Sequence, residues 1–473
     1  MELLVFAIPL LHLLGLLSAF KAVMETRTSQ GAIAWVIFLV AMPYVALPAY
    51  WIFGRSKFVG YRKVKEAVDA GVREKLEELL ERMEAQRVVR KGKDYAGAVA
   101  EQLADLPYTG HNSVKLLIDG EATFSSILGG IENAHSYILF QFFIVHDDEI
   151  GRKVQRHLII KAKEGVAVYF LYDEIGSHSL DAAYLEALRQ AGVKVSAFNS
   201  RRGWRNKFQL NFRNHRKVVV ADGRFAWIGG HNVGDEYLGK SEKFGHWRDT
   251  HLKMEGPAVL GAQLSFQEDW YWATRERIEG IEWTPKVSEE GKATVLVIPS
   301  GPADEMETAQ LMFLHAINSA KRRLWIATPY FVPDDAIVYA LQLAGMRGVD
   351  VRILIPDRPD HLTVWLAAFS YFEEAGRTGV RFYRYRKGFL HEKVMLIDKQ
   401  AATVGTANFD NRSFRLNFEI TTVVEDSEFI RDVEQMFEKD FSDSNLEVPE
   451  ILKTKPFWFR VASRLARLTA PIQ

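Results

Sequence analysis

The chain has 473 residues, of which 48% are hydrophobic and 12% aromatic, so it can fill two or three large cores. Lysine plus arginine and aspartate plus glutamate each total 60, so the formal net charge is zero and does not favour a nucleic-acid-binding protein. There is no cysteine, which excludes disulfides, thiolate metal sites and cysteine nucleophiles.

Two long apolar runs lie near the start of the chain. Residues 3–20 and 31–53 contain no charged side chain, and each is close to the roughly 17 to 25 residues that cross a bilayer as a helix. A cleaved signal peptide is the alternative for the first run, but that run lacks a basic start and a second apolar run follows soon after it. We therefore predict a two-helix transmembrane hairpin over residues 1–56.

Basic residues after the second apolar run predict the orientation of the hairpin. Five lysines and arginines lie within residues 55–65, a denser cationic flank than the loop between the two runs. By the positive-inside rule, this flank and the rest of the chain lie in the cytoplasm. In the segment that follows, "VREKLEELLERMEAQ" places leucines at helical spacing among charged residues, which predicts a charged helical connector over residues 57–109.

From about residue 110 the chain repeats itself. "IENAHSYILFQFFIVHDD" (131–148) is similar to "INSAKRRLWIATPYFVPDD" (317–335), each a helix end, an apolar strand and an Asp-Asp turn. Alternating strands and helices predict an α/β fold with two lobes, residues 110–285 and 286–450, packed about a pseudo-twofold axis. The polar segment 284–292 marks the boundary between them.

A short motif occurs once in each predicted lobe. In "NHRKVVVADGRFAWIGGHN" (214–232) a histidine and a lysine stand two apart on an apolar strand, so their side chains share a face. Alone, this segment is an ordinary β-hairpin. "HEKVMLIDKQAATVGTAN" (391–408) repeats its five spaced residues, and a buried lysine is costly unless it has a partner, so packing alone does not explain both copies. Apart from the glycines, the repeated residues are His215, Lys217, Asp222 and Asn232, and His391, Lys393, Asp398 and Asn408.

The duplicated H-x-K-x4-D-x6-G-x-x-N pattern resembles the signature of the phospholipase D superfamily. Together with "GGHNVGDEYLG" (229–239), "GTANFDNRSFRLNFE" (405–419) and the N-terminal hairpin, it makes nearly the whole chain similar to the bacterial cardiolipin synthases of that superfamily. The resemblance implies two phospholipase D-like lobes, each a mixed β-sheet flanked by helices. It also implies that two phosphatidylglycerol molecules give cardiolipin and glycerol, at the bacterial inner membrane.

The residue types of the motif suit phosphodiester chemistry. Such a reaction needs a nucleophile, cations for the phosphate oxygens and an acid for the leaving alkoxide. Two histidines can divide the first and third roles, because a pKa of about 6.5 lets one ring be neutral and the other protonated. The resemblance implies that His215 attacks phosphorus, giving a phosphatidyl-histidine, while His391 protonates glycerol, although pseudosymmetry permits the reverse. The groups predicted to hold the phosphate oxygens are Lys217, Lys393, Asn232 and Asn408.

Four acidic residues complete the predicted site. Asp249 and Glu419 each open the strand that follows a motif, so each is predicted to orient a histidine, with a strand-edge charge as the alternative. Asp222 and Asp398 belong to the signature of catalytic residues, but each ends a strand at a tight turn, which favours a structural role. We predict no metal, because the lysines and asparagines supply the charge that a metal would otherwise supply, and no nucleotide or other cofactor, because one phosphodiester is exchanged for another of similar energy.

The predicted partners are phosphatidylglycerol and cardiolipin in the bilayer, with no nucleic acid and with a homodimer left open. Residues 451–473 include "KPFWFRVASRLARL", typical of a basic amphipathic helix on anionic lipid, with a helix docked on the protein body as the alternative. Segments 204–212, which combines aromatic and basic residues, and 361–372, which is largely apolar, are candidates for lipid access, and core packing is the alternative for both. Other functions considered are a phospholipase D or phosphatidylserine synthase-like enzyme that passes the phosphatidyl group to water or serine, a nuclease of the superfamily, and an inactive membrane scaffold.

Overall fold

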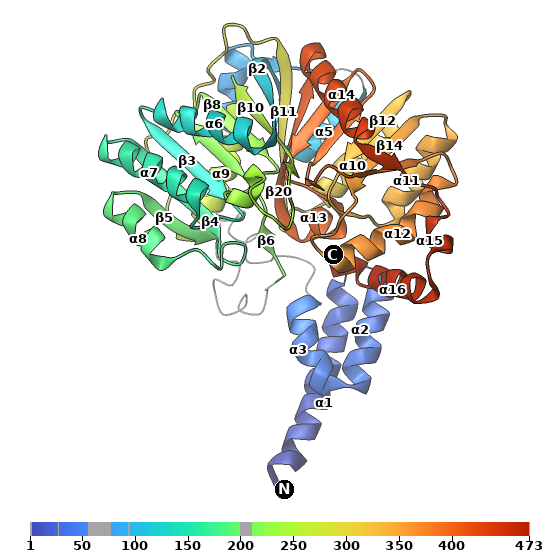
Figure 1. Ribbon diagram of the computed structural model, residues 1–473. Coiled ribbons are helices and arrows are strands. Elements are labelled where there is room, and N and C mark those ends of the chain that lie inside the picture. The colour runs from blue at the N-terminus through green and yellow to red at the C-terminus, as the bar shows by residue number, and fades with distance from the viewer. Residues whose placement is uncertain (1, 27, 55–76, 93–94, 199–210, 473) are drawn as a thin grey trace.

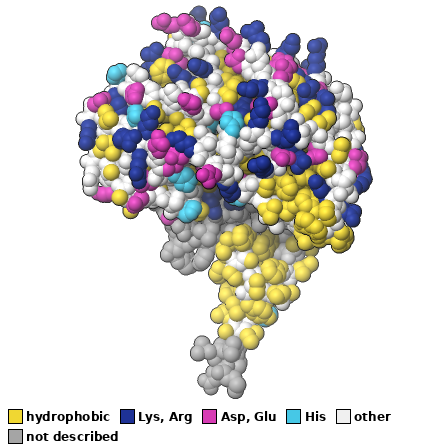
Figure 2. Space-filling model, viewed as in Figure 1, with side chains coloured by type: hydrophobic (Ala, Val, Ile, Leu, Met, Phe, Trp, Pro, Cys, Tyr) yellow, Lys and Arg dark blue, Asp and Glu magenta, His cyan; other side chains and the backbone are white. Residues whose placement is uncertain are grey.

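The computed structural model describes residues 2–26, 28–54, 77–92, 95–198 and 211–472. An α/β body carries a bundle of N-terminal helices that projects from one end (Figure 1). Hydrophobic side chains cover this bundle, whereas charged side chains are spread over much of the visible face of the body (Figure 2). The predicted basic flank at 55–65 and all but the end of the lipid-access candidate 204–212 lie outside the described residues.

The N-terminal bundle consists of three helices where two were predicted. They are α1 (Glu2–Glu25), α2 (Ser29–Ala41) and α3 (Pro43–Phe53). The second apolar run is divided because Pro43 has no N–H to continue the helix and disfavours helical geometry in the preceding residue. Met42 accordingly has φ −139° and ψ 61°. Among the described helices, only α1, over Phe6–Glu25, is long and apolar enough to cross a membrane by length and composition.

The described part of the predicted connector packs against the body. Residues 77–85 are helical and α5 spans Tyr95–Ala104, but a short strand, β1 (Val89–Arg90), lies between them. This strand pairs with the start of β2 (Tyr108–Ile118). The connector is therefore helical only in part.

The first half of the body is a mixed sheet covered by helices. β3 (Tyr137–Phe142), β4 (Ala167–Asp173) and β5 (Lys194–Phe198) are parallel neighbours. All six side chains of β3 are buried, as expected for a strand covered on both faces. Four antiparallel neighbours complete the sheet of this half. From β3 outward they are β7 (Val218–Ala221), β8 (Phe225–Gly229), β10 (Thr250–Glu255) and β2. Its helices are α6 (Asp119–Glu132), α7 (Glu149–Lys163), α8 (Ala182–Gln190) and α9 (Val259–Thr274).

The second half repeats this strand order. The parallel strands are β12 (Arg323–Ala327), β14 (Asp350–Pro356) and β15 (Arg381–Tyr385). From β12 the antiparallel order is β17 (Val394–Ile397), β18 (Ala401–Gly405), β20 (Asn417–Glu425) and β11 (Ala293–Ser300). β11 also pairs with β2, so one large mixed sheet runs through both halves. The main helices of this half are α10 (Thr308–Ser319), α11 (Asp335–Met346), α12 (Leu362–Gly376) and α14 (Ser427–Ser442).

The C-terminal segment forms α15 (Ile451–Thr454) and α16 (Phe457–Arg467). α16 packs against α12 and lies across the end of the body from which the N-terminal helices project (Figure 1). Most of the segment 361–372 belongs to α12, whose buried side chains include Ala367, Phe369 and Phe372. Core packing therefore accounts for much of that apolar segment.

Candidate active site

Two short parallel strand pairs cross between the halves and bring the motif residues together. β6 (Arg213–Asn214) pairs with the first residues of β20, and β9 (Trp247–Arg248) pairs with β16 (Phe389–Leu390). The N–H of His215 donates to Phe418 O at 2.9 Å, and the N–H of His391 donates to Arg248 O at 2.8 Å. Each histidine therefore enters the site beside the residue that precedes a carboxylate of the other half.

Each histidine is bonded to a carboxylate from the opposite half of the chain. His215 Nδ1 lies 2.9 Å from Glu419 Oε2, and His391 Nδ1 lies 2.7 Å from Asp249 Oδ2. Both carboxylates are fully buried. The sequence nominated these two carboxylates without assigning either to a histidine. A carboxylate at Nδ1 fixes the ring orientation and directs Nε2 toward a reacting group.

The environments of the two carboxylates differ. Glu419 also accepts hydrogen bonds from Thr406 Oγ1 at 2.6 Å, Ser413 Oγ at 2.9 Å and Asn417 Nδ2 at 3.1 Å. Asp249 Oδ1 accepts the N–H of Thr250 at 2.7 Å. The hydroxyl and amide donors around Glu419 were missed by sequence reasoning, although Thr406 and Ser413 lie in the quoted segment 405–419.

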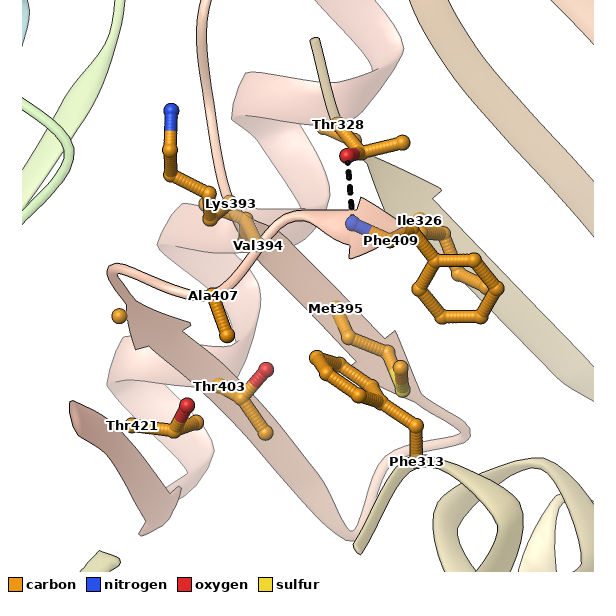
Figure 3. A pocket seen from close by; sticks show the side chains of 12 residues that line it. Phe313, Ile326, Thr328, Lys393, Val394, Met395, Thr403, Ala407, Phe409 and Thr421 are labelled. Atoms are coloured by element: carbon orange, nitrogen blue, oxygen red, sulfur yellow. Dashed lines mark hydrogen bonds between the residues drawn. The ribbon is translucent and has the colours of Figure 1, made fainter. Parts of the chain in front are cut away.

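Lys217 and Lys393 are buried beside the histidines. Lys217 Nζ donates to His215 O at 2.7 Å. Lys393 Nζ donates to His391 O and lies 2.9 Å from His391 Nδ1. A small pocket adjoins Lys393 and is lined by Thr328, Thr403, Thr421 and apolar side chains (Figure 3). The close-up shows the Lys393 side chain extending away from these residues.

Burial lowers the pKa values of the two lysines and the two histidines of the site. It lowers the pKa of Lys217 to about 7 and that of Lys393 to about 8, although the charges of Glu419 and Asp249 oppose this change. Burial also lowers the pKa of His215 to about 4, against the opposing charge of Glu419. For His391, burial and the nearby lysines hold the pKa well below its ordinary value.

Glu419 remains ionised in this environment. Burial raises the pKa of its carboxyl, but the charge and hydrogen bond of His215, together with Lys217 and Thr406, outweigh burial and leave the pKa below its ordinary value. The site thus holds a buried anion next to two buried amines. An incoming phosphate adds negative charge and favours the protonated form of the lysines and histidines.

Asp222 and Asp398 do not lie with the histidines. Each follows the inner strand of its motif hairpin, at positive φ of 54° and 52°. The Asp222 carboxylate accepts the backbone N–H groups of residues 135–137 at 2.8 to 2.9 Å, and that of Asp398 accepts those of residues 321–323 at the same distances. These hydrogen bonds anchor the hairpin turns, in line with the structural role that the tight turns favour, and a catalytic role of Asp222 and Asp398 stays a prediction.

The two motif asparagines are both buried but have different partners. Asn232 Oδ1 accepts the N–H of Ile144 at 3.1 Å, and its Nδ2 donates to Tyr237 Oη at 3.2 Å. Asn408 donates its backbone N–H to Ser413 Oγ, while its Oδ1 has no hydrogen-bond partner among the described residues. The two asparagines therefore differ in the capacity that they leave for a ligand.

Aromatic rings surround the histidines. The ring of Phe143 lies 5.0 Å from that of His215, and the ring of Trp247 lies 5.1 Å from that of His391. Sequence reasoning missed both, although Phe143 is in the first repeated segment and Trp247 stands two residues before Asp249. Across the described residues, no group of three or more histidine, aspartate or glutamate side chains has the arrangement of a metal site.

Comparisons with known proteins identify the family. A family model described as "Cardiolipin synthase, PLD-like domain" matches residues 127–244 and 313–441, and one described as "Phospholipase_D-nuclease N-terminal" matches residues 10–55. Cardiolipin synthase A of Pseudomonas fluorescens Pf-5 is 47% identical over 99% of this chain and 98% of its own. That of Pseudomonas entomophila L48 is 48% identical over the same shares.

A solved structure shares the fold. The crystal structure of phosphatidylserine synthase from Haemophilus influenzae Rd KW20 covers 80% of this chain and 100% of its own, with a TM-score of 0.61 and 14% sequence identity. At that identity the likeness concerns the fold alone. With the family model matching both halves and the relatives matching almost end to end, the chain belongs to the cardiolipin synthase family of phospholipase D-like proteins.

Proposed function

We propose that this protein is a cardiolipin synthase that condenses two phosphatidylglycerol molecules into cardiolipin and glycerol. The observation that carries the proposal is the buried pair of histidines, each bonded at Nδ1 to a carboxylate of the other half and each beside a buried lysine. The names of the full-length relatives support the same activity. The arrangement provides a nucleophile, a proton carrier and cationic groups without a nucleotide.

In the first step, His215 Nε2 attacks phosphorus and His391 Nε2 gives a proton to the departing glycerol oxygen. Glu419 stabilises the positive charge that develops on His215, and Asp249 does so for His391. Lys217, Lys393 and the motif asparagines hold the non-bridging oxygens. In the second step, His391 takes the proton of a glycerol hydroxyl of another phosphatidylglycerol, whose oxygen displaces His215 from phosphorus.

The repeated strand order supports two lobes, residues 110–285 and 286–450, related by a pseudo-twofold axis. Each contributes one histidine and the carboxylate that orients the other lobe's histidine. The active site then lies between the lobes. A boundary at 284–292 agrees with the strand order, because β10 and α9 belong to the first half and β11 is the first strand of the second half.

The N-terminal helices anchor the protein in the bacterial inner membrane, with residues 1–56 as the membrane segment and the lobes in the cytoplasm. α1 provides a helix of spanning length, and α2 with α3 provides the returning apolar segment. α16 then lies on the lipid surface, because Phe457, Trp458 and Leu465 are exposed on a helix that carries Arg460 and Arg464.

The activity is tested with purified protein in vesicles that contain phosphatidylglycerol as the sole phospholipid. Cardiolipin and glycerol should form in equal amounts without added metal or nucleotide, and His215→Ala and His391→Ala should each abolish both products. Phosphatidic acid as the main product would instead identify a hydrolase.

The oligomeric state is tested separately. Light scattering of the purified protein distinguishes a monomer from the homodimer that the sequence leaves open.

A further inference from the structure

The two halves present different side chains next to their histidines. On the first half, Phe143 packs against His215 and is followed by Ile144. On the second half, the ring of Tyr330 lies 6.5 Å from that of His391, nearly perpendicular to it. A side chain with a phenol hydroxyl therefore lies near His391.

Strand pairing shows that Tyr330 and Ile144 occupy corresponding positions. Ile144 precedes Val145, which pairs with the residue after Asn232. Tyr330 precedes the first residue of β13 (Phe331–Val332), which pairs with the residue after Asn408, the first of β19 (Phe409–Asp410). A phenol thus takes the place of an aliphatic side chain on the His391 side.

A carboxylate and the chain's surface lie beyond this phenol. The Tyr330 hydroxyl donates to Asp360, and Asp360 Oδ1 accepts the N–H of His361 at 2.6 Å. The side chain of Asp360 is 15% exposed and that of His361 is 71% exposed, so this group reaches the solvent. Burial lowers the pKa of Lys393, and the charge of Asp360 is among those that oppose it, so the carboxylate acts on the phosphate-binding cation.

A buried acceptor adds to this group. Asn408 Oδ1 has no hydrogen-bond partner among the described residues, whereas the corresponding oxygen of Asn232 accepts the Ile144 N–H. A buried carbonyl oxygen is stable only with a donor. Phosphate diester oxygens only accept hydrogen bonds and cannot satisfy Asn408 Oδ1, whereas a hydroxyl group of the substrate can donate to it.

We propose that Tyr330, Asp360 and Asn408 form a hydroxyl-binding subsite beside His391 that holds the glycerol headgroup of phosphatidylglycerol through the hydroxyl that does not react. The inference rests on the proposed function and adds the position of the headgroup. In the second transfer, one glycerol hydroxyl gives its proton to His391 as its oxygen bonds to phosphorus and the P–N bond to His215 breaks. The neighbouring hydroxyl donates to the Asp360 carboxylate or the Asn408 oxygen.

The subsite predicts that the enzyme distinguishes a diol from a simple alcohol. Vesicles of phosphatidylglycerol are incubated with the full-length protein and equal concentrations of 1,2-propanediol and 1-propanol, and the two phosphatidyl alcohols are quantified. The diol product should exceed the propanol product about tenfold or more, because a site built to bond a hydroxyl rejects an analogue that lacks it. Asp360→Asn and Tyr330→Phe should each lower that ratio about tenfold.

The ratio is insensitive to the folded fraction, because both products come from the same active molecules. Ser179→Ala is the matched control, since Ser179 contacts His146 on the first half and should leave the ratio unchanged. A wild-type ratio near one, or an unchanged ratio in both subsite variants, would overturn the inference. A diol preference in a protein that makes no cardiolipin from phosphatidylglycerol would support the subsite and reject the proposed function.

Discussion

His215 and Glu419 are 204 residues apart in the chain, yet His215 Nδ1 lies 2.9 Å from Glu419 Oε2 in the buried centre of the molecule. His391 and Asp249 form the reciprocal contact at 2.7 Å. Each histidine is thus bonded at Nδ1 to a carboxylate from the other half of the chain.

Replacing the orienting carboxylates should reduce the rate while the fold remains. Glu419→Gln and Asp249→Asn keep the shape but lose the charge that stabilises an imidazolium, so cardiolipin formation should fall by about a hundredfold to ten-thousandfold. Initial rates in phosphatidylglycerol vesicles measure this. Glu255→Gln, on the partly exposed end of β10 and paired with Arg224, is the control and should keep the wild-type rate. A less than threefold loss in both variants would contradict the orienting role.

The buried lysines should lower the free energy of unfolding of the protein. Lys217 is fully buried, and burial lowers its pKa to about 7. Lys217→Met should therefore abolish cardiolipin formation and raise the free energy of unfolding by about 1–3 kcal/mol, because it removes a buried amine that is hard to charge. Thermal unfolding in detergent measures the change, with the exposed Lys163→Met as control. A lower melting temperature for Lys217→Met would show that the ammonium stabilises the resting protein.

Acidification should destabilise the protein through His215. Its pKa is about 4 when folded and about 6.5 when unfolded, so the unfolded chain binds more protons between these values. Stability is therefore lost as pH falls from about 6.5 to about 4, by up to about 3 kcal/mol for this group. Unfolding midpoints measured across this range should fall less steeply with pH in His215→Gln than in the wild type. Parallel profiles for the two proteins would refute the assignment.

The motif aspartates should behave as structural residues. Asp222 accepts three backbone N–H groups at positive φ, so Asp222→Ala leaves these donors unpaired and should lower the free energy of unfolding by about 2 kcal/mol or more. The folded protein should retain most of its rate per molecule. Denaturant unfolding and activity normalised to the folded fraction separate the two effects. A normalised rate reduced a hundredfold or more would place Asp222 in the chemistry.

The duplicated motif predicts more of the site than any single segment does. The spacing of His215 and Lys217 predicts that their side chains share a strand face, but both residues lie between β6 and β7 rather than on a strand. The second copy of the motif points to a shared phosphate site. The two carboxylates are predictable because each lies at the start of the apolar run that follows a motif; in the structure Asp249 directly precedes β10 and Glu419 is the third residue of β20. Their cross-pairing is not predictable from local patterns, because it depends on β6 and β9, two-residue strands whose partners are more than a hundred residues away.

The N-terminal helices show a second feature that hydropathy alone does not predict. Hydropathy treats residues 31–53 as one apolar run, whereas the backbone breaks at Met42 because Pro43 cannot donate a hydrogen bond. Likewise, Tyr330 and Asp360 are separated by two strands and a helix, β13, α11 and β14, so no spacing rule joins them. Both features depend on backbone geometry and tertiary packing, which composition does not encode.

Arg248 lies where the two halves meet. It donates hydrogen bonds to Asp440 and Asp119 and forms an ion pair with Glu392, the residue between His391 and Lys393. Because each half is chemically incomplete, any substitution that loosens this joint separates both histidines from their carboxylates together. Such a variant would lose turnover as sharply as one lacking a histidine, although no reacting atom had changed. In this protein, loss of activity after a point substitution reports on the packing of the two halves as much as on the chemistry. The contacts of His215 with Glu419 and of His391 with Asp249 distinguish the two causes, because separation of the halves breaks both.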